Sequence, residues 1–136
     1  MKQEDLYLAE TGKSPAEFAR DFAEVVTKYG FIINNADTMD MGKTFRAHGA
    51  QAGQDFDLHM IQICKPEKAA KSLAANPERS VLMPKFVMAF SKEGKTQLRF
   101  LSYNTEDISL IVADAVFPGS LAESFQKIRE MIDEAR

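Results

Sequence analysis

The chain has 136 residues, of which 45% are hydrophobic and 27% are charged. This length predicts a single domain, residues 1–136, and the apolar side chains are numerous enough to form a hydrophobic core. Its net charge of −3 argues against a dedicated nucleic-acid-binding domain, which is usually basic. A single cysteine, Cys64, excludes a disulfide-stapled secreted scaffold.

The ends and the apolar runs of the chain bear on its location. The N-terminus has no apolar segment of the kind that a signal peptide needs, and no apolar run approaches the roughly 18 residues of a membrane span. We therefore expect a cytoplasmic protein that binds neither a membrane nor nucleic acid.

The first half of the chain predicts a long amphipathic helix between short strands. Ser14-Pro15-Ala16-Glu17 is a capping box with proline at the first helical position. Apolar residues then recur at helical spacing until Gly30 ends the helix. The other elements expected here are strands at 6–9, 31–33 and 56–64 and a short helix at 39–47.

The second half predicts a hairpin between helices. Pro66 opens a helix of good helix formers, which Asn76-Pro77 ends. Gly94 suits the turn of a hairpin. The strands of this hairpin are expected at 81–91, interrupted by Pro84-Lys85, and at 96–103.

Two helices are expected to complete the chain. Thr105 caps the first, which runs to Val116 and is broken by Pro118-Gly119. Ser120-Leu121-Ala122-Glu123 is a second capping box, which opens the last helix. The order β-α-β-β-α-β-β-α-α indicates an α+β fold of two layers, with a mostly antiparallel sheet and helices on one face.

The strand predicted at 81–91 is apolar on both faces. Residues two apart share a face, and both rows of this strand are mostly hydrophobic. Because helices cover one face of a two-layer sheet, the other face must meet a second subunit, a ligand or a loop, and we expect either a homodimer or an apolar ligand pocket. Symmetric dimers are common among soluble proteins, which favours a homodimer.

Two stretches carry a family resemblance, Ile61-Gln62-Ile63-Cys64-Lys65-Pro66 and Leu82-Met83-Pro84-Lys85-Phe86-Val87-Met88. A strand that ends in a Cys-Asn-Pro-like turn, then a short Ala/Leu helix, then an apolar strand opened by Met-Pro resembles the domain of unknown function 302 family. The resemblance covers nearly the whole chain. It implies a curved, TATA-binding-protein-like antiparallel sheet with helices on one side and association as dimers or larger, and it leaves the biochemical role open.

The chain departs from that family at two positions. Lys65 stands where the family often has Asn, and Lys85 stands where many members have Cys. Any two-thiol site implied by the resemblance would therefore keep only Cys64 here, which argues against a dithiol redox or Cys–Cys metal role.

Cys64 is the first candidate site residue. It ends a strand two residues before a helix N-terminus, where N–H groups and Lys65 would favour a reactive thiolate. This suggests a thiol-dependent redox or sulfur-handling protein as an alternative function. A small hydrophobe buried at a strand end is the simpler interpretation.

The other candidates lie next to Cys64 and within two of the predicted strands. Lys85, a charge within an apolar strand, would bind an anionic group or a partner's carboxylate, or extend to solvent. Lys65, Pro66 and His59 complete a candidate ligand-binding set with Cys64 and Lys85. His59 and the methionines would also suit a soft metal, although their spacing matches no closed site and methionine usually fills cores.

No catalytic motif stands out. The chain lacks a Gly-rich phosphate loop, HExxH, CxxC and GxSxG, so neither catalytic residues nor a cofactor follow from the sequence. The leading hypothesis is a dimerising binding module that takes a small apolar or anionic ligand. The alternatives are the thiol protein and a soft-metal binder.

Overall fold

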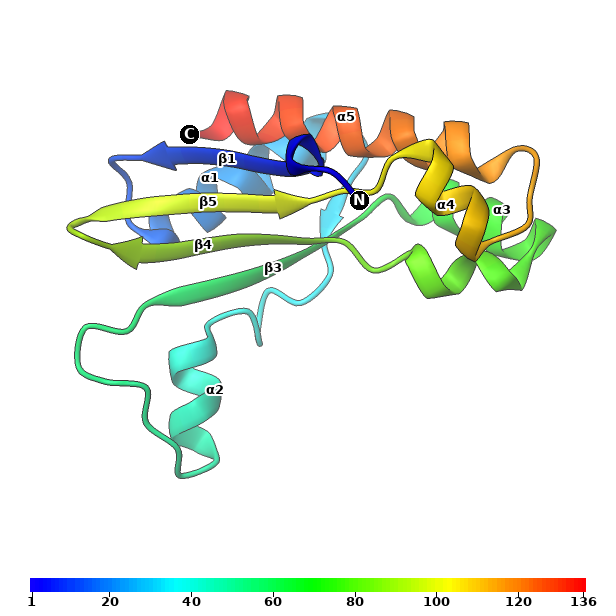
Figure 1. Ribbon diagram of the computed structural model, residues 1–136. Helices are drawn as coiled ribbons and strands as arrows, with labels where there is room; N and C mark the ends of the chain where they lie inside the picture. Colours follow the sequence, from blue (N-terminus) through cyan, green and yellow to red (C-terminus); the bar gives the residue numbers. More distant parts are fainter.

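The computed structural model describes all residues, 1–136, and forms a sheet with helices packed against it (Figure 1). The strands are Leu6–Thr11 (β1), Ile32–Ile33 (β2), Leu58–Cys64 (β3), Phe86–Lys92 (β4) and Lys95–Leu101 (β5). The α-helices are Pro15–Lys28 (α1), Met41–Ala47 (α2), Pro66–Ala75 (α3), Thr105–Ile111 (α4) and Phe117–Ala135 (α5). Short 3₁₀ helices span Gln3–Asp5 and Pro77–Leu82.

The five strands form one sheet in the order β1-β5-β4-β3-β2, and every neighbouring pair is antiparallel. The predicted α+β fold with an antiparallel sheet is confirmed. The β4–β5 turn places Glu93 and Gly94 at φ values of 55° and 79°, which is the left-handed conformation that such turns require. None of the helices is both long enough and apolar enough to cross a membrane.

The core lies between one face of the sheet and helices α1 and α5. Alternate residues of β3 and β4, such as Ile61 and Val87, are fully buried on this inner face. Phe18 and Phe22 of α1 stack with ring centroids 5.3 Å apart against them. The predicted helix cap is present, because Ser14 Oγ accepts a hydrogen bond from the Glu17 amide at 3.1 Å.

The strand predicted at 81–91 begins only at Phe86. Residues 77–82 form a 3₁₀ helix instead, because Asn76 caps a new turn by accepting a hydrogen bond from the Glu78 amide at 3.1 Å. Lys85 therefore lies in the loop before β4 and not within an apolar strand, and the prediction for this segment is wrong.

The boundaries of the last two helices also differ from the expectation. Asn104, not Thr105, caps α4, which ends at Ile111. Pro118 lies in the first turn of α5, where proline needs no hydrogen-bonded amide. Asp114 Oδ1 accepts hydrogen bonds from the amides of Val116 and Phe117, both at 2.9 Å. Ser120 is therefore not a helix cap.

Candidate ligand-binding site

A pocket opens where the end of β3, the helix α3, the loop before β4 and the first turns of α5 meet. The pocket is partly open to solvent and has a cavity volume of about 40 Å³, which is room for a small group. Its apolar lining is Phe31, Ile63, Ala69, Met83, Phe117 and Leu121. Its polar lining is Cys64, Lys65, Lys68, Ser72, Lys85, Ser120 and Ser124.

Two helix N-termini border this pocket. Cys64 is the last residue of β3, and α3 begins two residues later at Pro66. The helix α5 begins at Phe117, which also lines the pocket. The start of α3 carries a partial positive charge from unpaired backbone N–H groups, whereas the Phe117 amide at the start of α5 already donates to Asp114. The α3 end and the lysine side chains therefore favour the same sign of ligand.

Three lysine side chains line the pocket, and no carboxylate lies within ion-pair distance of any of them. Lys68 Nζ donates to the Ser124 hydroxyl at 2.8 Å and to the Ser120 carbonyl at 3.0 Å. Lys85 Nζ donates to the Met83 carbonyl at 2.9 Å. Lys65 Nζ lies 5.3 Å from the centroid of the Phe31 ring. The pocket is therefore electropositive.

Burial lowers the pKa of two of these amines. For Lys85, removal from water is the largest cause of the lowered pKa, and the nearby charge of Lys68 adds to it, whereas a thiolate at Cys64 would oppose it. Burial likewise lowers the pKa of Lys68, against the more distant carboxylate of Glu123. An anion in the pocket would favour the charged form of both.

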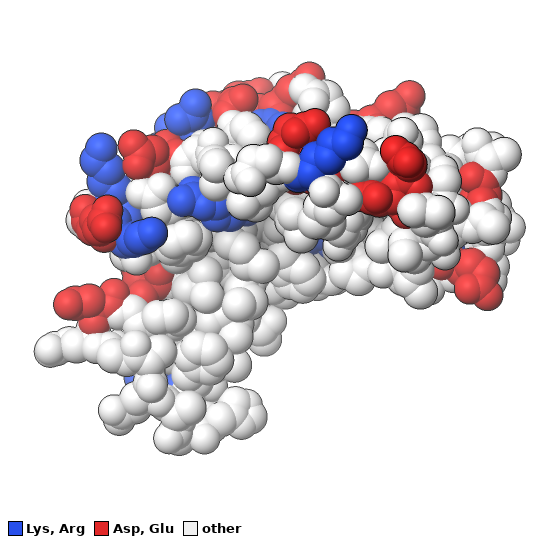
Figure 2. Space-filling model, viewed as in Figure 1, with Lys and Arg blue, Asp and Glu red and all other residues white.

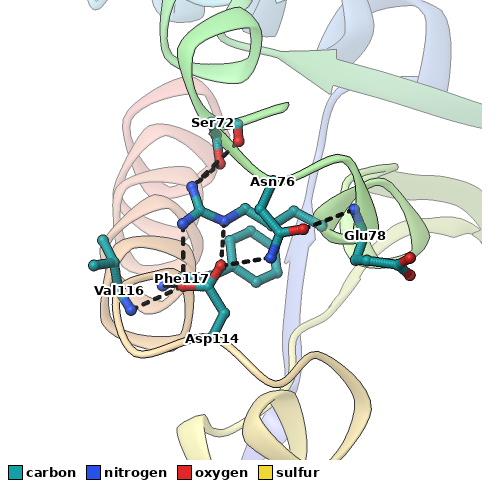
Figure 3. A network of polar contacts seen from close by, with 7 residues as sticks. Ser72, Asn76, Glu78, Asp114, Val116 and Phe117 are labelled. Carbon is teal, nitrogen blue, oxygen red and sulfur yellow. Dashed lines mark hydrogen bonds and ion pairs between the residues drawn. The ribbon is translucent and has the colours of Figure 1, made fainter. Parts of the chain in front are cut away.

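A buried ion pair fixes the walls of the pocket (Figure 3). The Arg79 guanidinium donates to both carboxylate oxygens of Asp114, at 2.7 and 3.0 Å, and to the carbonyl and hydroxyl of Ser72 on α3, at 3.2 and 3.1 Å. Asn76 Nδ2 donates to Asp114 at 2.8 Å. Because Asp114 also caps α5 through the Phe117 amide, this network holds α3 and α5 against each other.

The structure brings together three of the five predicted site residues. Cys64, Lys65 and Lys85 line the pocket. Pro66 is exposed at the start of α3 and lies outside the lining. His59 lies on the inner face of β3, 6% exposed, with Nδ1 unpaired and 3.6 Å from Asp57 Oδ1. It belongs to a different part of the sheet.

The lining also contains residues that sequence reasoning did not assign to a site. Lys68 lies one turn after Lys65 on α3, so their helical spacing is the signal that could have identified it. Ser120 and Ser124 lie one turn apart on α5. The sequence predicts Ser120 as a helix cap, and no local pattern marks Ser124 as a site residue.

No group of three or more His, Cys, Asp and Glu side chains lies close enough together to hold a metal ion. Met39 and Met83 pack against the hydrophobic core. The structure therefore offers no set of His, Cys, Asp and Glu ligands in support of the soft-metal hypothesis.

Comparison with known proteins supports the resemblance found in the sequence. The family model "Domain of unknown function DUF302" matches residues 8–135. The crystal structure of an uncharacterized conserved DUF302 protein from Bacillus stearothermophilus is similar to this chain, with a TM-score of 0.78 and 15% sequence identity, over 96% of this chain and 98% of that one. This likeness establishes the fold. No curated protein matches the chain.

Proposed function

This chain belongs to the DUF302 family, and from its pocket we propose that it is a binding protein for a small anionic ligand. The observation that carries this proposal is the set of three pocket lysines without an acidic partner. Gathering unpaired charges in a half-buried site costs free energy. An anion would offset that cost through charge-assisted hydrogen bonds.

The size and the walls of the pocket restrict the ligand. A space of about 40 Å³ admits a group of a few heavy atoms, such as a carboxylate or a phosphate. The Ser124 hydroxyl and the Lys68 amine are already hydrogen-bonded to each other and both can donate to an anion. Phe31 and Leu121 would contact a short apolar part of the ligand.

Thermal unfolding with and without small anions tests this proposal. Inorganic phosphate, acetate and pyruvate are compared with chloride at the same ionic strength. We expect at least one of the three probes to raise the Tm, because a ligand that binds the folded state stabilises it. If none of them raises the Tm above the chloride control, the proposal is wrong.

A matched pair of variants localises the effect. Lys68→Met removes a pocket cation, whereas Lys71→Met removes an exposed lysine of the same helix that pairs with Glu67. We expect Lys68→Met to abolish the rise in Tm and Lys71→Met to retain it. Equal losses in the two variants would show that the anion binds elsewhere.

We also propose that the outer face of the sheet, turned away from α1 and α5, forms a homodimer. The residues of this face on β3 and β4 are apolar or uncharged, namely Leu58, Met60, Gln62, Phe86, Met88 and Phe90. Figure 2 views this side of the molecule and has few charges over β3 and β4. An apolar sheet face favours pairing with a second copy. Light scattering at low micromolar concentration tests this: a clean monomer would refute it.

The thiol-dependent alternative rests on Cys64, which lines the same pocket and is the free cysteine of the chain. No second thiol is available to complete a dithiol site. We propose that Cys64 contributes a wall of the anion site, and that the protein resides in the cytoplasm, where such a thiol stays reduced.

A further inference from the structure

The amine of Lys85 lies in the pocket region without a carboxylate partner. Lys85 lines the pocket, and its Nζ donates hydrogen bonds to the carbonyl of Met83 and, at 3.8 Å, to the sulfur of the same residue. The charged groups that share the pocket with it are two further cations, Lys65 and Lys68. No carboxylate is within ion-pair distance to hold it in the charged form.

Such an environment makes a lysine nucleophilic. Apolar walls and neighbouring cations disfavour the ammonium form, so a larger fraction of the side chain carries a free lone pair at neutral pH. The lowered pKa of Lys85, caused mainly by burial, agrees with this geometry. Lysines in this situation react with carbonyl compounds.

We propose that the ligand is a short-chain 2-oxo acid and that Lys85 binds its carbonyl carbon covalently as an imine. This inference rests on the proposed function, because Lys68 and Ser124 would hold the carboxylate of the same molecule. A 2-oxo acid carries its carboxylate and its carbonyl on adjacent carbons. That arrangement matches two amines, Lys68 and Lys85, that line one small pocket.

The reaction is balanced without an oxidant or a reductant. The lone pair of Lys85 Nζ forms a bond to the carbonyl carbon, the π pair moves to oxygen, and a proton passes from nitrogen to that oxygen. The nitrogen lone pair then forms the C=N bond as the C–O bond breaks. The hydroxyl leaves with a proton as water, so an amine and a ketone give an imine and water, and hydrolysis reverses the step.

Reductive trapping tests the proposal. The protein is incubated with pyruvate and sodium cyanoborohydride, which adds hydride to the imine carbon and leaves a stable secondary amine. Intact-mass measurement and peptide mapping then compare the rate of modification of each lysine. We expect Lys85 to be modified at least ten times faster than exposed lysines such as Lys71. Modification spread over exposed lysines, with Lys85 no faster, would overturn the proposal.

Two controls separate this inference from the anion site. Lys85→Arg keeps the positive charge but cannot form the imine, and we expect it to lose the fast adduct. Lys71→Arg should retain the fast adduct. If wild-type protein is stabilised by the anions but gives no fast adduct, the imine is refuted and the anion site stands. If it shows neither, both proposals fail. The mapping uses wild-type protein, so the result does not depend on how the variants fold.

Discussion

Asp114 connects three features of the molecule through a single carboxylate. It pairs with Arg79, accepts from Asn76 and caps the first turn of α5. The Arg79 guanidinium also lies 5.6 Å from the centroid of the Phe117 ring. Removal of this carboxylate would leave a buried cation without a partner, which destabilises proteins strongly.

We predict that Asp114→Asn lowers the Tm by more than about 5 °C at neutral pH. The reason is the loss of the ion pair together with most of the helix cap. Thermal unfolding followed by circular dichroism measures the change. Asp133→Asn, an exposed residue near the end of α5 that pairs with Arg136, is the control and should change the Tm little. Equal effects in the two variants would contradict the central position of Asp114.

The same carboxylate should dominate acid unfolding. Hydrogen bonds from Arg79 and Asn76 hold the pKa of Asp114 well below its ordinary value of 3.8. In the unfolded chain the group takes up its proton at the ordinary value, so the stabilisation is complete above it and is lost as the pH falls toward the folded-state pKa. We therefore predict that stability falls steeply below about pH 4 in the wild type. The free energy of unfolding should fall less steeply with decreasing pH in Asp114→Asn than in the wild type. Identical slopes in the two proteins would contradict this prediction.

Substitution of Cys64 distinguishes a reactive thiol from a side chain that only lines the pocket. Serine is nearly isosteric with cysteine and keeps the half-buried position filled, so we predict that Cys64→Ser changes stability by less than about 2 kcal/mol. The anion-induced rise in Tm should remain. Loss of that rise in Cys64→Ser, with the fold intact, would favour the thiol-dependent alternative instead.

At the scale of elements, local sequence predicted helices and strands well where one physical signal acted alone. The helix α1 has its predicted N-terminal serine cap and its apolar stripe in the structure, although no hydrogen bond from the Ser14 amide to the Glu17 side chain completes the predicted capping box. The strand expected at 56–64 is present as β3, Leu58–Cys64, and its residues alternate in burial. Where a proline allowed two interpretations, the prediction was wrong. Pro84 does not interrupt a strand but precedes it, and Pro118 does not break a helix but begins one.

The sequence predicts both Ser14 and Ser120 as helix caps, and substitution of each serine tests which of them stabilises a helix. Ser14 caps α1, whereas Ser120 lies inside the first turns of α5. We predict that Ser14→Ala costs about 1 kcal/mol of stability. Ser120→Ala should cost less, because its backbone carbonyl and not its hydroxyl accepts from Lys68. Denaturant unfolding compares the two, and a larger loss at Ser120 would contradict the placement of the α5 cap.

The candidate site could be predicted only in part for a related reason. Cys64 and Lys65 lie at a turn that the sequence marks plainly. The sequence also marks Lys85 as a candidate, although it predicts that residue within a strand and the structure has it in the loop before β4. Ser120 and Ser124 lie more than fifty residues beyond Lys68 along the chain, and only the packing of α5 against α3 brings them to that lysine. Such contacts depend on tertiary structure and leave no local pattern.

At the scale of the whole molecule, the sheet has two different faces. One is covered by α1 and α5, and the other is apolar across β3 and β4. Leu8 of β1, on this outer face, is 54% exposed. Beyond the β3 edge, α2 extends away from the rest of the fold (Figure 1).

We predict that Leu8→Lys weakens the proposed homodimer by placing a charge on the outer face. Leu110→Lys, which changes a residue of α4 that is 79% exposed, should leave the assembly unchanged. Because both leucines are exposed, neither change should unfold the monomer. Analytical ultracentrifugation over a range of concentrations compares the dissociation constants. If both variants associate as tightly as the wild type, the interface lies elsewhere.

The most direct test of the anion site is a titration of isotopically labelled protein with inorganic phosphate, acetate and pyruvate, followed by backbone amide NMR. We predict saturable chemical-shift changes centred on Cys64, Lys68 and Leu121, with little change on the outer face of the sheet. Shifts that never saturate, or that centre on residues outside the pocket between α3 and α5, would contradict it.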